Sequence, residues 1–430
     1  MYRKFIEQLR VWEKNKTKEP LLVTGARQVG KTWLIKEFCR EEYADYVYIN
    51  FEEREDYASA FEGSLSPKDI LRTLSILAER KITESTAIFF DEIQLCERAV
   101  TSLKYFCEAE ENYRIICAGS LLGVKLKRFQ GSFPVGKVII KHMYPLDFEE
   151  FLIASGDEDL KDMIREHYNL ITPINPAVHD KALSKYHDYL FVGGMPKIVD
   201  NYIKTKNVMD VQPELFESLR MSYLADMSKH VKSAAESLKI SEVYNSIPRQ
   251  LANENPKFKY KEVKNTANKR DYFSAIDWLN ASGMVIKVNN ADSIASPIKG
   301  YENQDNFKLY ISDPGILANL CRLKMSDILS SEHNTYKGAV IENYVISQFT
   351  ASEKYFCYYK PSDSMEIDVV LDEDDGVVPC EIKSGRHKRS TSLKNYIEEY
   401  HPKRAIKLSE LNFGQADNLI SIPLYAIFCI

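Results

Sequence analysis

The sequence has no uninterrupted hydrophobic stretch of the length that crosses a membrane or forms the core of a signal peptide. Phe5, Ile6, Leu9 and Trp12 follow helical spacing near the N-terminus, but charged residues lie between them. These absences argue against a secreted or membrane-embedded protein. We therefore expect a cytoplasmic protein with no membrane partner.

Paired cysteines are also absent, since none of the eight cysteines belongs to a C-x-x-C motif. Cys117, Cys380 and Cys429 lie in apolar, strand-like stretches where a small buried thiol fits. This pattern favours a reducing compartment, although the even number of cysteines leaves a disulfide open.

A surplus of positive charge is missing as well, because the formal net charge is -5 at pH 7. Any contact with nucleic acid therefore has to come from a local basic patch. What the composition does contain is 44% hydrophobic and 28% charged residues, which is typical of folded globular domains and argues against disorder. A length of 430 residues predicts two to four domains in series.

The strongest motif is GARQVGKT, which follows an apolar strand at 21–24 and precedes an amphipathic helix. This context is what the G-x-x-x-x-G-K-[ST] pattern requires. Its glycines let the backbone turn N–H groups toward an anion, and the helix directs its positive end to the same place. The residues expected to bind ATP are Gly25, Ala26, Arg27, Gln28, Val29, Gly30, Lys31 and Thr32. We expect Lys31 to reach the terminal phosphates and Thr32 to give an oxygen to Mg²⁺.

A second motif, TAIFFDEIQ, ends an apolar strand in Asp91 and Glu92. Paired with the upstream loop, Asp91 is expected to support Mg²⁺ and Glu92 to polarise the attacking water. The alternative is a buried strand followed by an acidic loop. Ser120 closes a later apolar strand, where it is expected either to sense the γ-phosphate or to cap a helix or turn.

Apolar strands alternate with helical stretches through the first third of the chain. Further strands are predicted at 46–50, 113–120 and 137–143, with helices at 67–80 and 100–108. This alternation predicts an α/β fold in which helices cover both faces of a parallel sheet and ligand binds at the carboxyl ends of the strands.

Six motifs in this order, GARQVGKT, FFDEIQ, AGSLLGV, SFPVGKV, MYPLDFEEFL and YLFVGGMP, resemble the AAA-type P-loop ATPases of bacteria and archaea that carry a C-terminal domain of uncharacterised function. The resemblance extends over almost the whole chain. It implies a P-loop NTPase sheet flanked by helices, a helical lid, a winged-helix-like segment and a small α/β domain similar to restriction endonucleases. The corresponding boundaries are 1–145, 146–235, 236–330 and 331–430.

One position departs from that family. Many relatives have a glycine-arginine pair after the sensor strand, whereas Gly136 is followed here by Lys137. Lysine cannot make the planar two-pronged contact of a guanidinium with phosphate. Arg98 and Arg128 are candidate replacements, but both are typical of surface arginines. No arginine finger is therefore assigned, and an oligomer is left open.

The segment from about 145 to 232 has helical periodicity, with GGMP at 193–196 as either a hinge or a plain turn. After it, helices followed by two strands predict a winged helix. The basic residues expected to hold DNA phosphates are Lys257, Lys259, Lys261, Lys264, Lys269 and Arg270, with Phe258 and Tyr260 interleaved. Winged helices also bind proteins, and a basic run is often a solvated face.

Near the C-terminus, VVPCEIKSG places Glu381 and Lys383 two residues apart on a predicted strand, so that they share one face. Asp368 on the neighbouring strand and Glu342 on a helix at 336–350 complete a set that resembles the D-x(n)-E-x-K constellation of restriction-enzyme-like and junction-resolving nucleases. The resemblance implies that the three carboxylates hold a second divalent cation, Mg²⁺ or Mn²⁺, and that Lys383 stabilises charge on a scissile phosphate.

Two interpretations of the C-terminal region stay open. Either its site is a working nuclease, or the fold persists without cleavage and the charges merely discourage edge pairing. The remaining elements predicted here are strands at 366–371 and 377–383, an acidic turn at 372–375, a helix at 392–400 and a closing strand at 425–430. The leading function is an ATPase whose nucleotide state controls a DNA-binding, nuclease-like module. The alternative is an ATPase switch or scaffold that binds protein partners.

Overall fold

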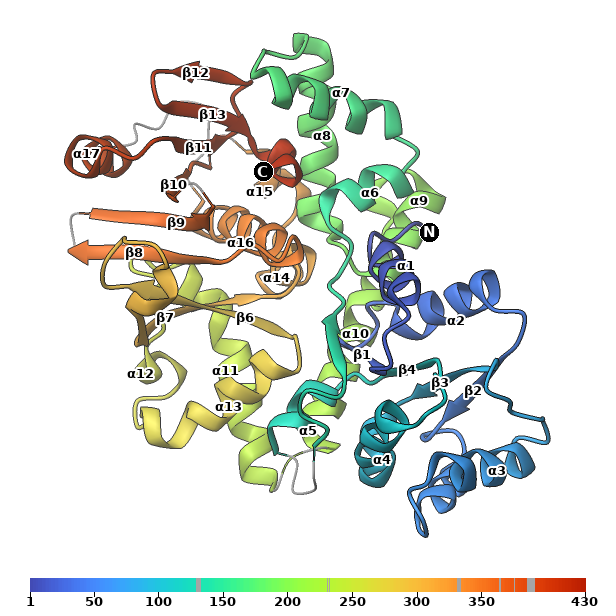
Figure 1. Cartoon of the computed structure of the whole chain (residues 1–430). Coiled ribbons are helices and arrows are strands. Elements are labelled where there is room, and N and C mark those ends of the chain that lie inside the picture. The colour runs from blue at the N-terminus through green and yellow to red at the C-terminus, as the bar shows by residue number, and fades with distance from the viewer. Residues whose placement is uncertain are drawn as a thin grey trace. The chain divides into compact units, whose positions relative to one another are not determined.

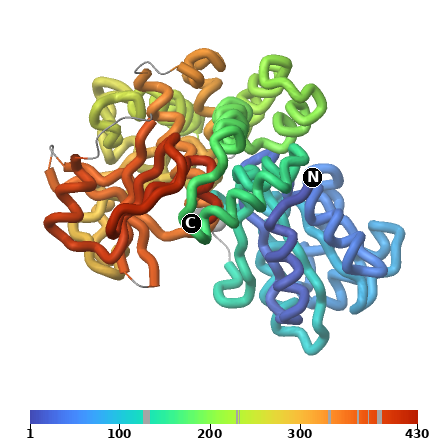
Figure 2. The backbone as a smooth tube through the Cα atoms, turned by 90° about the horizontal axis from the view of Figure 1, so that it is seen from above, coloured from blue at the N-terminus to red at the C-terminus, as the bar shows by residue number. Residues whose placement is uncertain are grey.

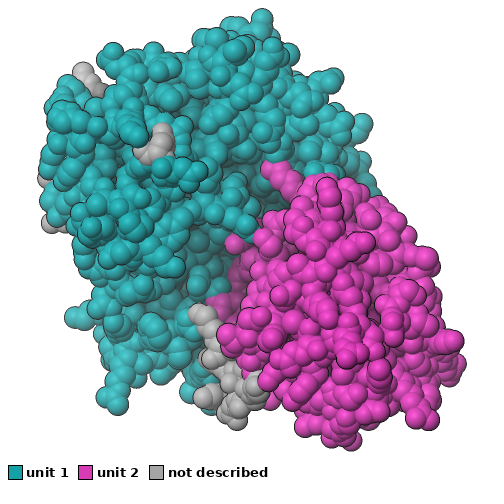
Figure 3. Space-filling model, viewed as in Figure 1, with its two compact units in different colours: residues 1–2, 145–280, 284–430 teal, residues 3–144, 281–283 magenta. Residues whose placement is uncertain are grey.

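The computed structural model describes residues 1–128, 133–229, 231, 233–330, 334–362, 365–374, 376–384 and 391–430. The chain separates into two units, which Figure 3 shows in different colours. The smaller unit comprises residues 3–144 and 281–283, and the larger unit comprises residues 1–2, 145–280 and 284–430. No helix within these described ranges is both long and apolar enough to cross a membrane. All eight cysteines lie in the described ranges and are free thiols.

The smaller unit is built on a parallel five-stranded sheet (Figure 1). Its strands are β1 (Leu21–Thr24), β2 (Tyr46–Asn50), β3 (Ala87–Asp91), β4 (Ile115–Ala118) and β5 (Ile139–His142). The order β2-β3-β4-β1-β5 places β1 between β4 and β5. Every residue of β1, β3 and β4 is buried, which explains why these strands are short apolar runs in the sequence. The predicted α/β class is confirmed.

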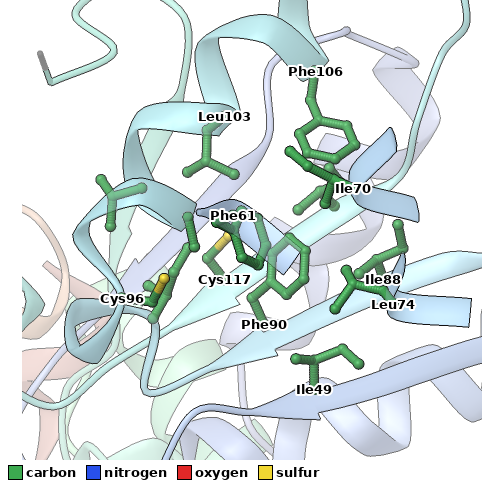
Figure 4. Close-up of a cluster of buried hydrophobic side chains, with 14 of the residues drawn as sticks. Ile49, Phe61, Ile70, Leu74, Ile88, Phe90, Cys96, Leu103, Phe106 and Cys117 are labelled. Carbon is green, nitrogen blue, oxygen red and sulfur yellow. The ribbon is translucent and has the colours of Figure 1, made fainter. Parts of the chain in front are cut away.

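Helices flank this sheet. They are α1 (Phe5–Asn15), α2 (Lys31–Glu42), η1 (Glu55–Phe61), α3 (Pro67–Leu77), η2 (Ile93–Leu95), α4 (Glu97–Glu108) and α5 (Leu122–Arg128). A hydrophobic core on one face joins β3 to η1, α3 and α4 (Figure 4). Within it, the ring centroids of Phe51, Phe61 and Phe90 lie 5.9 Å from one another. Because side chains alternate along a strand, Phe89 and Asp91 point to the opposite face.

The larger unit begins with helices, as the periodicity predicted. They are α6 (Phe148–Ala154), α7 (Glu158–Leu170), α8 (Pro176–Val192), α9 (Pro196–Thr205), η3 (Val208–Asp210) and α10 (Pro213–Lys229). Asp147 begins α6 with a capping box, in which its side chain accepts a hydrogen bond from the Glu150 backbone N–H.

The GGMP segment between α8 and α9 is a turn that is held from two sides. Gly193 has a φ of 73°, and a Cβ at Gly194 would overlap the carbonyl oxygen of Leu146. The Gly194 N–H donates to Oδ2 of Asp313 at 2.6 Å, while Oδ1 accepts from the Ile316 N–H at 2.9 Å. Burial raises the pKa of Asp313 to about 6. This packing favours the turn interpretation over a hinge.

The next elements follow the predicted order of helices and a hairpin. They are α11 (Ala234–Leu251), α12 (Tyr260–Val263), α13 (Lys269–Ala281), β6 (Val285–Ala291), η4 (Ile298–Tyr301) and β7 (Glu302–Ile311). The sequence did not predict that β6 also pairs in parallel with β8 (Phe356–Ser362), with Asn290 opposite Tyr358. The hairpin is therefore part of the C-terminal sheet.

That sheet is mixed and has eight strands in the order β12-β13-β11-β10-β9-β8-β6-β7. The remaining strands of the sheet are β9 (Met365–Glu373), β10 (Gly376–Ile382), β11 (Ala405–Ser409), β12 (Gly414–Ala416) and β13 (Leu419–Pro423). The remaining helices of this part of the chain are α14 (Pro314–Leu320), α15 (Met325–Leu329), α16 (Thr335–Ala351), α17 (Thr391–Tyr400) and η5 (Leu424–Cys429). Figure 2 shows the C-terminal strands, coloured orange to red, running side by side.

The predicted closing strand at 425–430 is wrong, because Leu424–Cys429 form the 3₁₀-helix η5. A short apolar run has the same composition in a buried helix as in a buried strand. Here the run packs on helices instead of pairing with a strand: the Tyr344 hydroxyl donates to the Leu424 carbonyl at 3.0 Å, and the rings of Phe148 and Phe428 lie 6.2 Å apart.

Candidate nucleotide site and carboxylate pocket

In the loop between β1 and α2, the backbone at two positions has a conformation that requires glycine. Gly25 has a φ of 141°, and a Cβ there would overlap the carbonyl oxygen of Met143. Gly30 has a φ of 97° directly before α2. The two glycines thus allow the tight loop that the motif predicted. Between them lie Ala26, Arg27, Gln28 and Val29, and Gln28 also has a positive φ, of 66°.

The Lys31 ammonium lies inside this loop. Its Nζ donates to the carbonyl oxygens of Gly25 at 2.8 Å and Ala26 at 2.9 Å, and the residue is buried. Nearby, His142 Nδ1 lies 2.9 Å from Oγ1 of Thr24. Burial, and to a lesser extent the Lys31 charge, lowers the pKa of His142 to about 4. The imidazole is therefore neutral near pH 7 and adds no positive charge to the loop.

Arg3 supports the loop from the chain segment before α1, which sequence reasoning missed. Its guanidinium donates to the Val29 carbonyl at 2.7 Å and to the Tyr144 carbonyl at 2.5 Å, and the residue is buried. A guanidinium can make several such bonds at once because its donors are fixed in one plane. No local pattern around Arg3 indicates this role, since both partners are backbone atoms far along the chain.

The structure brings Thr32 and Asp91 together at the carboxyl end of β3. Oγ1 of Thr32 donates to Oδ2 of Asp91 at 2.8 Å, and the Tyr48 hydroxyl donates to the same oxygen at 3.0 Å. Asp91 is buried, with 3% of its surface exposed. A hydroxyl and a carboxylate side by side are oxygen donors of the kind that a hard cation such as Mg²⁺ takes. Tyr48 was not predicted, because its contact depends on β2 lying next to β3.

Glu92 follows directly and has a left-handed backbone with a φ of 50°. Its N–H donates to Oδ1 of Asp91 at 3.1 Å, and Nε2 of Gln94 donates to its carboxylate. Burial raises the pKa of the Glu92 carboxyl above its ordinary value. Ser120 is buried two residues beyond β4, which is hydrogen-bonded to β3. Both residues thus lie past the carboxyl ends of adjacent parallel strands.

Arg98, one of the two candidate replacements for an arginine finger, and Lys137, at the position that departs from the family, both have other contacts. The Arg98 guanidinium donates to the carbonyls of Phe61 and of Gly63, the latter at 2.8 Å. Nζ of Lys137 lies 3.4 Å from a carboxylate oxygen of Glu108. The side chain of Arg128 is outside the described part of the chain. Arg98 therefore has a structural role in its own unit.

In the larger unit, the three predicted carboxylates, those of Glu342, Asp368 and Glu381, line one pocket of about 410 Å³. Asp368 lies on β9 and Glu381 on the adjacent β10, and Glu342 lies on α16. Lys383 follows the end of β10 and forms an ion pair with Glu381, so these two side chains share a face as predicted. The pocket thus collects carboxylates from two strands and one helix.

A buried lysine that sequence reasoning missed already contacts two carboxylates of this pocket. Nζ of Lys308, on β7, lies 2.9 Å from Oε1 of Glu342 and 2.8 Å from Oε1 of Glu366, and the lysine side chain is 1% exposed. The Tyr310 hydroxyl donates to Oε1 of Glu342 at 2.5 Å. Burial opposes the charge on Lys308, but Glu342, Tyr310 and Glu366 raise its pKa well above the ordinary value. The sequence did contain a signal for this role, because Lys308 lies inside the apolar run FKLYIS, where a lysine is expected to be buried and paired.

Of the two remaining carboxylates, that of Glu381 is buried and that of Asp368 is partly buried. Oδ2 of Asp368 accepts a hydrogen bond from the Ile382 N–H at 2.7 Å, and Oε2 of Glu381 has no hydrogen-bond partner among the described residues. Burial, followed by the charges of Glu381 and Glu342, raises the pKa of Asp368 well above its ordinary value. In the described ranges, no three His, Cys, Asp or Glu side chains stand in a metal-binding arrangement. A cation at this pocket therefore stays a prediction.

The predicted basic segment is largely solvent-facing. Lys259, Lys261, Lys264, Lys269 and Arg270 are exposed, and Lys257 is partly buried. Lys269 forms an ion pair with Asp305 on β7. Phe258 is buried, and its ring stacks on Phe307 with centroids 5.4 Å apart. Phe258 thus belongs to the core and is not available to stack on a base.

Comparison with known families divides the chain into three matches. Residues 17–152 match the model described as an AAA domain. Residues 183–327 and 337–427 each match a domain of unknown function, DUF8612 and DUF4143 respectively. A restriction-endonuclease-like fold for the C-terminal residues is therefore not shown. The comparison with curated proteins finds no match.

The comparison with solved structures finds three ATPase or nucleotide-complex structures among its matches. A Walker-type ATPase of Pyrococcus abyssi is 14% identical, with a TM-score of 0.44 over 75% of this chain and 96% of that chain. The ORC2 protein of Aeropyrum pernix is 12% identical, with a TM-score of 0.38 over 80% and 94%. DnaA of Aquifex aeolicus is 15% identical, with a TM-score of 0.27 over 64% and 88%. The match of residues 17–152 to the AAA-domain model, together with the parallel five-stranded sheet, identifies these residues as an AAA-type P-loop ATPase domain.

Proposed function

We propose that the protein binds ATP with Mg²⁺ at the loop of the smaller unit and hydrolyses it. The observation that carries this proposal is the meeting of Thr32 and Asp91, at 2.8 Å, directly beside Glu92. Oxygen donors for a cation, an ammonium for phosphates and a carboxylate for water thus occur together at one edge of a parallel sheet.

Each residue has a separate task in this reaction. Lys31 exchanges its contacts with the Gly25 and Ala26 carbonyls for the terminal phosphates, helped by the N–H groups at the start of α2. Thr32 and Asp91 hold Mg²⁺, which when bound neutralises charge on the phosphates. Glu92 orients the attacking water and accepts its proton, and Ser120 contacts the γ-phosphate or that water.

Binding and hydrolysis are tested separately. Trp33 is 50% exposed and directly follows Thr32, so its fluorescence should report titration with Mg-ATP. Glu92→Gln should keep this binding and lower the hydrolysis rate by about 10²- to 10⁴-fold, which is the usual contribution of a positioned general base. A Trp33→Phe variant is the control for the signal. Unchanged hydrolysis in Glu92→Gln would remove the assigned base.

We further propose that nucleotide state controls an activity of the larger unit on DNA. Support comes from the exposed basic residues at 259–270, the helix-helix-hairpin order that a winged helix requires, and the carboxylate pocket. In such a nuclease, Glu342, Asp368 and Glu381 hold a divalent cation, and Lys383 stabilises charge on the phosphate. The expected outcome is that DNA at low salt stimulates ATP turnover, because phosphate contacts weaken as salt is added. Manganese-dependent plasmid nicking should disappear in Lys383→Ala.

One observation favours the alternative, in which the larger unit is an inactive nuclease fold that serves a protein-binding switch. Lys308 already pairs with Glu342 and Glu366, which reduces the negative charge available to a cation. DNA binding without nicking, unchanged by Lys383→Ala, would support an inactive sensor. Turnover that no DNA form alters would support the protein-binding switch.

A further inference from the structure

Gln94 connects the predicted base to the end of a neighbouring strand. It lies on η2 and is buried, with 3% of its surface exposed. Its Nε2 donates to Oε2 of Glu92. Its Oε1 is buried without a hydrogen-bond partner among the described residues, and it occupies the space that a side chain at Gly119 would fill. Gly119 directly follows β4 and precedes Ser120.

The orientation of this amide follows from its partner. A carboxylate only accepts hydrogen bonds, so the amide NH₂ group has to face Glu92 and the amide oxygen has to face Gly119. Leaving a buried oxygen unpaired is unfavourable, so the arrangement needs a compensating reason. Holding Glu92 is such a reason, because this residue has a left-handed backbone with a φ of 50°, which a non-glycine residue keeps only with support.

We propose that Gln94 is a positioning residue of the ATPase reaction, which fixes the Glu92 carboxylate and couples it to the end of β4 at Gly119. The inference rests on the proposed hydrolysis at this loop. A neutral amide suits the task, because it orients the carboxylate without pairing it with a full positive charge, which would weaken it as a base. A displacement of Gly119 and Ser120 would therefore move Gln94 and change the position of the Glu92 carboxylate.

The first test replaces the amide and keeps the length of the side chain. Gln94→Met should lower kcat by about 10- to 100-fold, as is common when a supporting hydrogen bond to a functional group is removed. The Kd for Mg-ATP, measured by Trp33 fluorescence, should stay within about twofold, because Gln94 contacts no predicted ligand of the nucleotide. The matched control is Gln8→Met on α1, whose Oε1 is also buried without a partner among the described residues. It should leave kcat unchanged.

The second test approaches Gln94 from the strand. A methyl group in Gly119→Ala would overlap the amide of Gln94 and should push it away from Glu92. Gly119 is not among the glycines with positive φ, so alanine fits its backbone. The expected loss of kcat is similar to that of Gln94→Met. Gly63→Ala is the control, because no atom lies within 4 Å of the added methyl group.

A double-mutant cycle decides whether Gln94 acts through Glu92. If it does, Gln94→Met in the Glu92→Gln background should cause no further loss of kcat, whereas a purely structural role predicts that the two losses multiply. Multiplying losses, or full kcat in Gln94→Met, would overturn the inference alone. Equal rates for the wild type and Glu92→Gln would overturn the proposed function, and the positioning role with it.

Discussion

The two units each contain a buried lysine, but the groups that the two ammonium groups contact differ. In the smaller unit, Lys31 donates to the neutral carbonyls of Gly25 and Ala26. In the larger unit, Lys308 lies between the charged carboxylates of Glu342 and Glu366. An anionic ligand can replace neutral dipoles at modest cost, whereas separating a buried ion pair costs several kcal/mol. The first lysine is therefore suited to binding and the second to holding a structure together.

The largest effect is expected when the structural lysine is removed. Lys308→Met leaves two carboxylates without their buried counter-ion and should lower the free energy of unfolding by about 3–5 kcal/mol. In a Trp12→Phe/Trp33→Phe background, the buried Trp278 reports unfolding of the larger unit by urea. Lys360→Met is the control, since Lys360 also contacts Glu366 but its side chain is 17% exposed. A Lys308→Met protein as stable as the wild type would contradict the comparison.

The converse change affects activity more than folding. Lys31→Ala should lower ATP hydrolysis by about 10²- to 10³-fold, as expected for the loss of a charge that stabilises phosphate in the transition state. Lys31→Ala should lower the free energy of unfolding less than Lys308→Met does, because the Gly25 and Ala26 carbonyls that Lys31 contacts are uncharged. Hydrolysis and urea unfolding of both lysine variants form one experiment. If both variants lost hydrolysis and stability to the same extent, the charge of the contacted groups would not decide whether a buried lysine serves binding or stability.

Asp313 of the larger unit is a buried acid whose hydrogen-bond partners are neutral backbone N–H groups, so it extends the comparison from lysines to carboxylates. Burial raises the pKa of Asp313 from its ordinary value of 3.8 to about 6, so the folded state binds more protons than the unfolded state between these values. Stability should therefore fall as the pH rises from about 4 to about 6 and then level off. In the wild type, the free energy of unfolding should change by about 3 kcal/mol over this pH range because of Asp313, and Asp313→Asn should abolish that change. Unfolding of the larger unit from pH 4 to 7 measures it, with the exposed Asp210→Asn as the control.

The smallest effect concerns Tyr48. Tyr48→Phe removes one of the hydroxyl groups that donate to Oδ2 of Asp91, at 3.0 Å, and keeps the ring. One lost hydrogen bond of about 1 kcal/mol should raise the Mg²⁺ concentration for half-maximal hydrolysis about fivefold. Tyr57→Phe is a matched control, because the Tyr57 hydroxyl contacts Arg54 away from Asp91. An unchanged Mg²⁺ dependence would show that Thr32 and the Glu92 N–H orient the carboxylate without Tyr48.

The residues of the nucleotide site that the sequence could predict lie in two continuous motifs and, for Ser120, just after a third apolar strand. GARQVGKT directly follows β1, and FFDEIQ contains the end of β3 and the residues after it, so their positions at the sheet edge follow from local order. Tyr48 and Arg3 could not be predicted in this way. Their contacts depend on which strands are neighbours and on a guanidinium that reaches backbone atoms more than twenty residues away.

In the larger unit, the carboxylate residues were found because two of them lie on adjacent strands of one hairpin. Lys308 was missed, since its partners Glu342 and Glu366 are distant in sequence and only their meeting in the fold gives it a role. The pairing of β6 with β8 was also missed, because no pattern in a strand specifies its parallel neighbour.

The shared eight-stranded sheet has a practical consequence for anyone who shortens this protein. A fragment that begins at residue 331 would lack β6 and leave one edge of β8 without its partner. Such a bare edge invites association with other chains. The same cut would also remove Lys308. A fragment of this kind should therefore aggregate, and its failure to cleave DNA would say nothing about the intact chain.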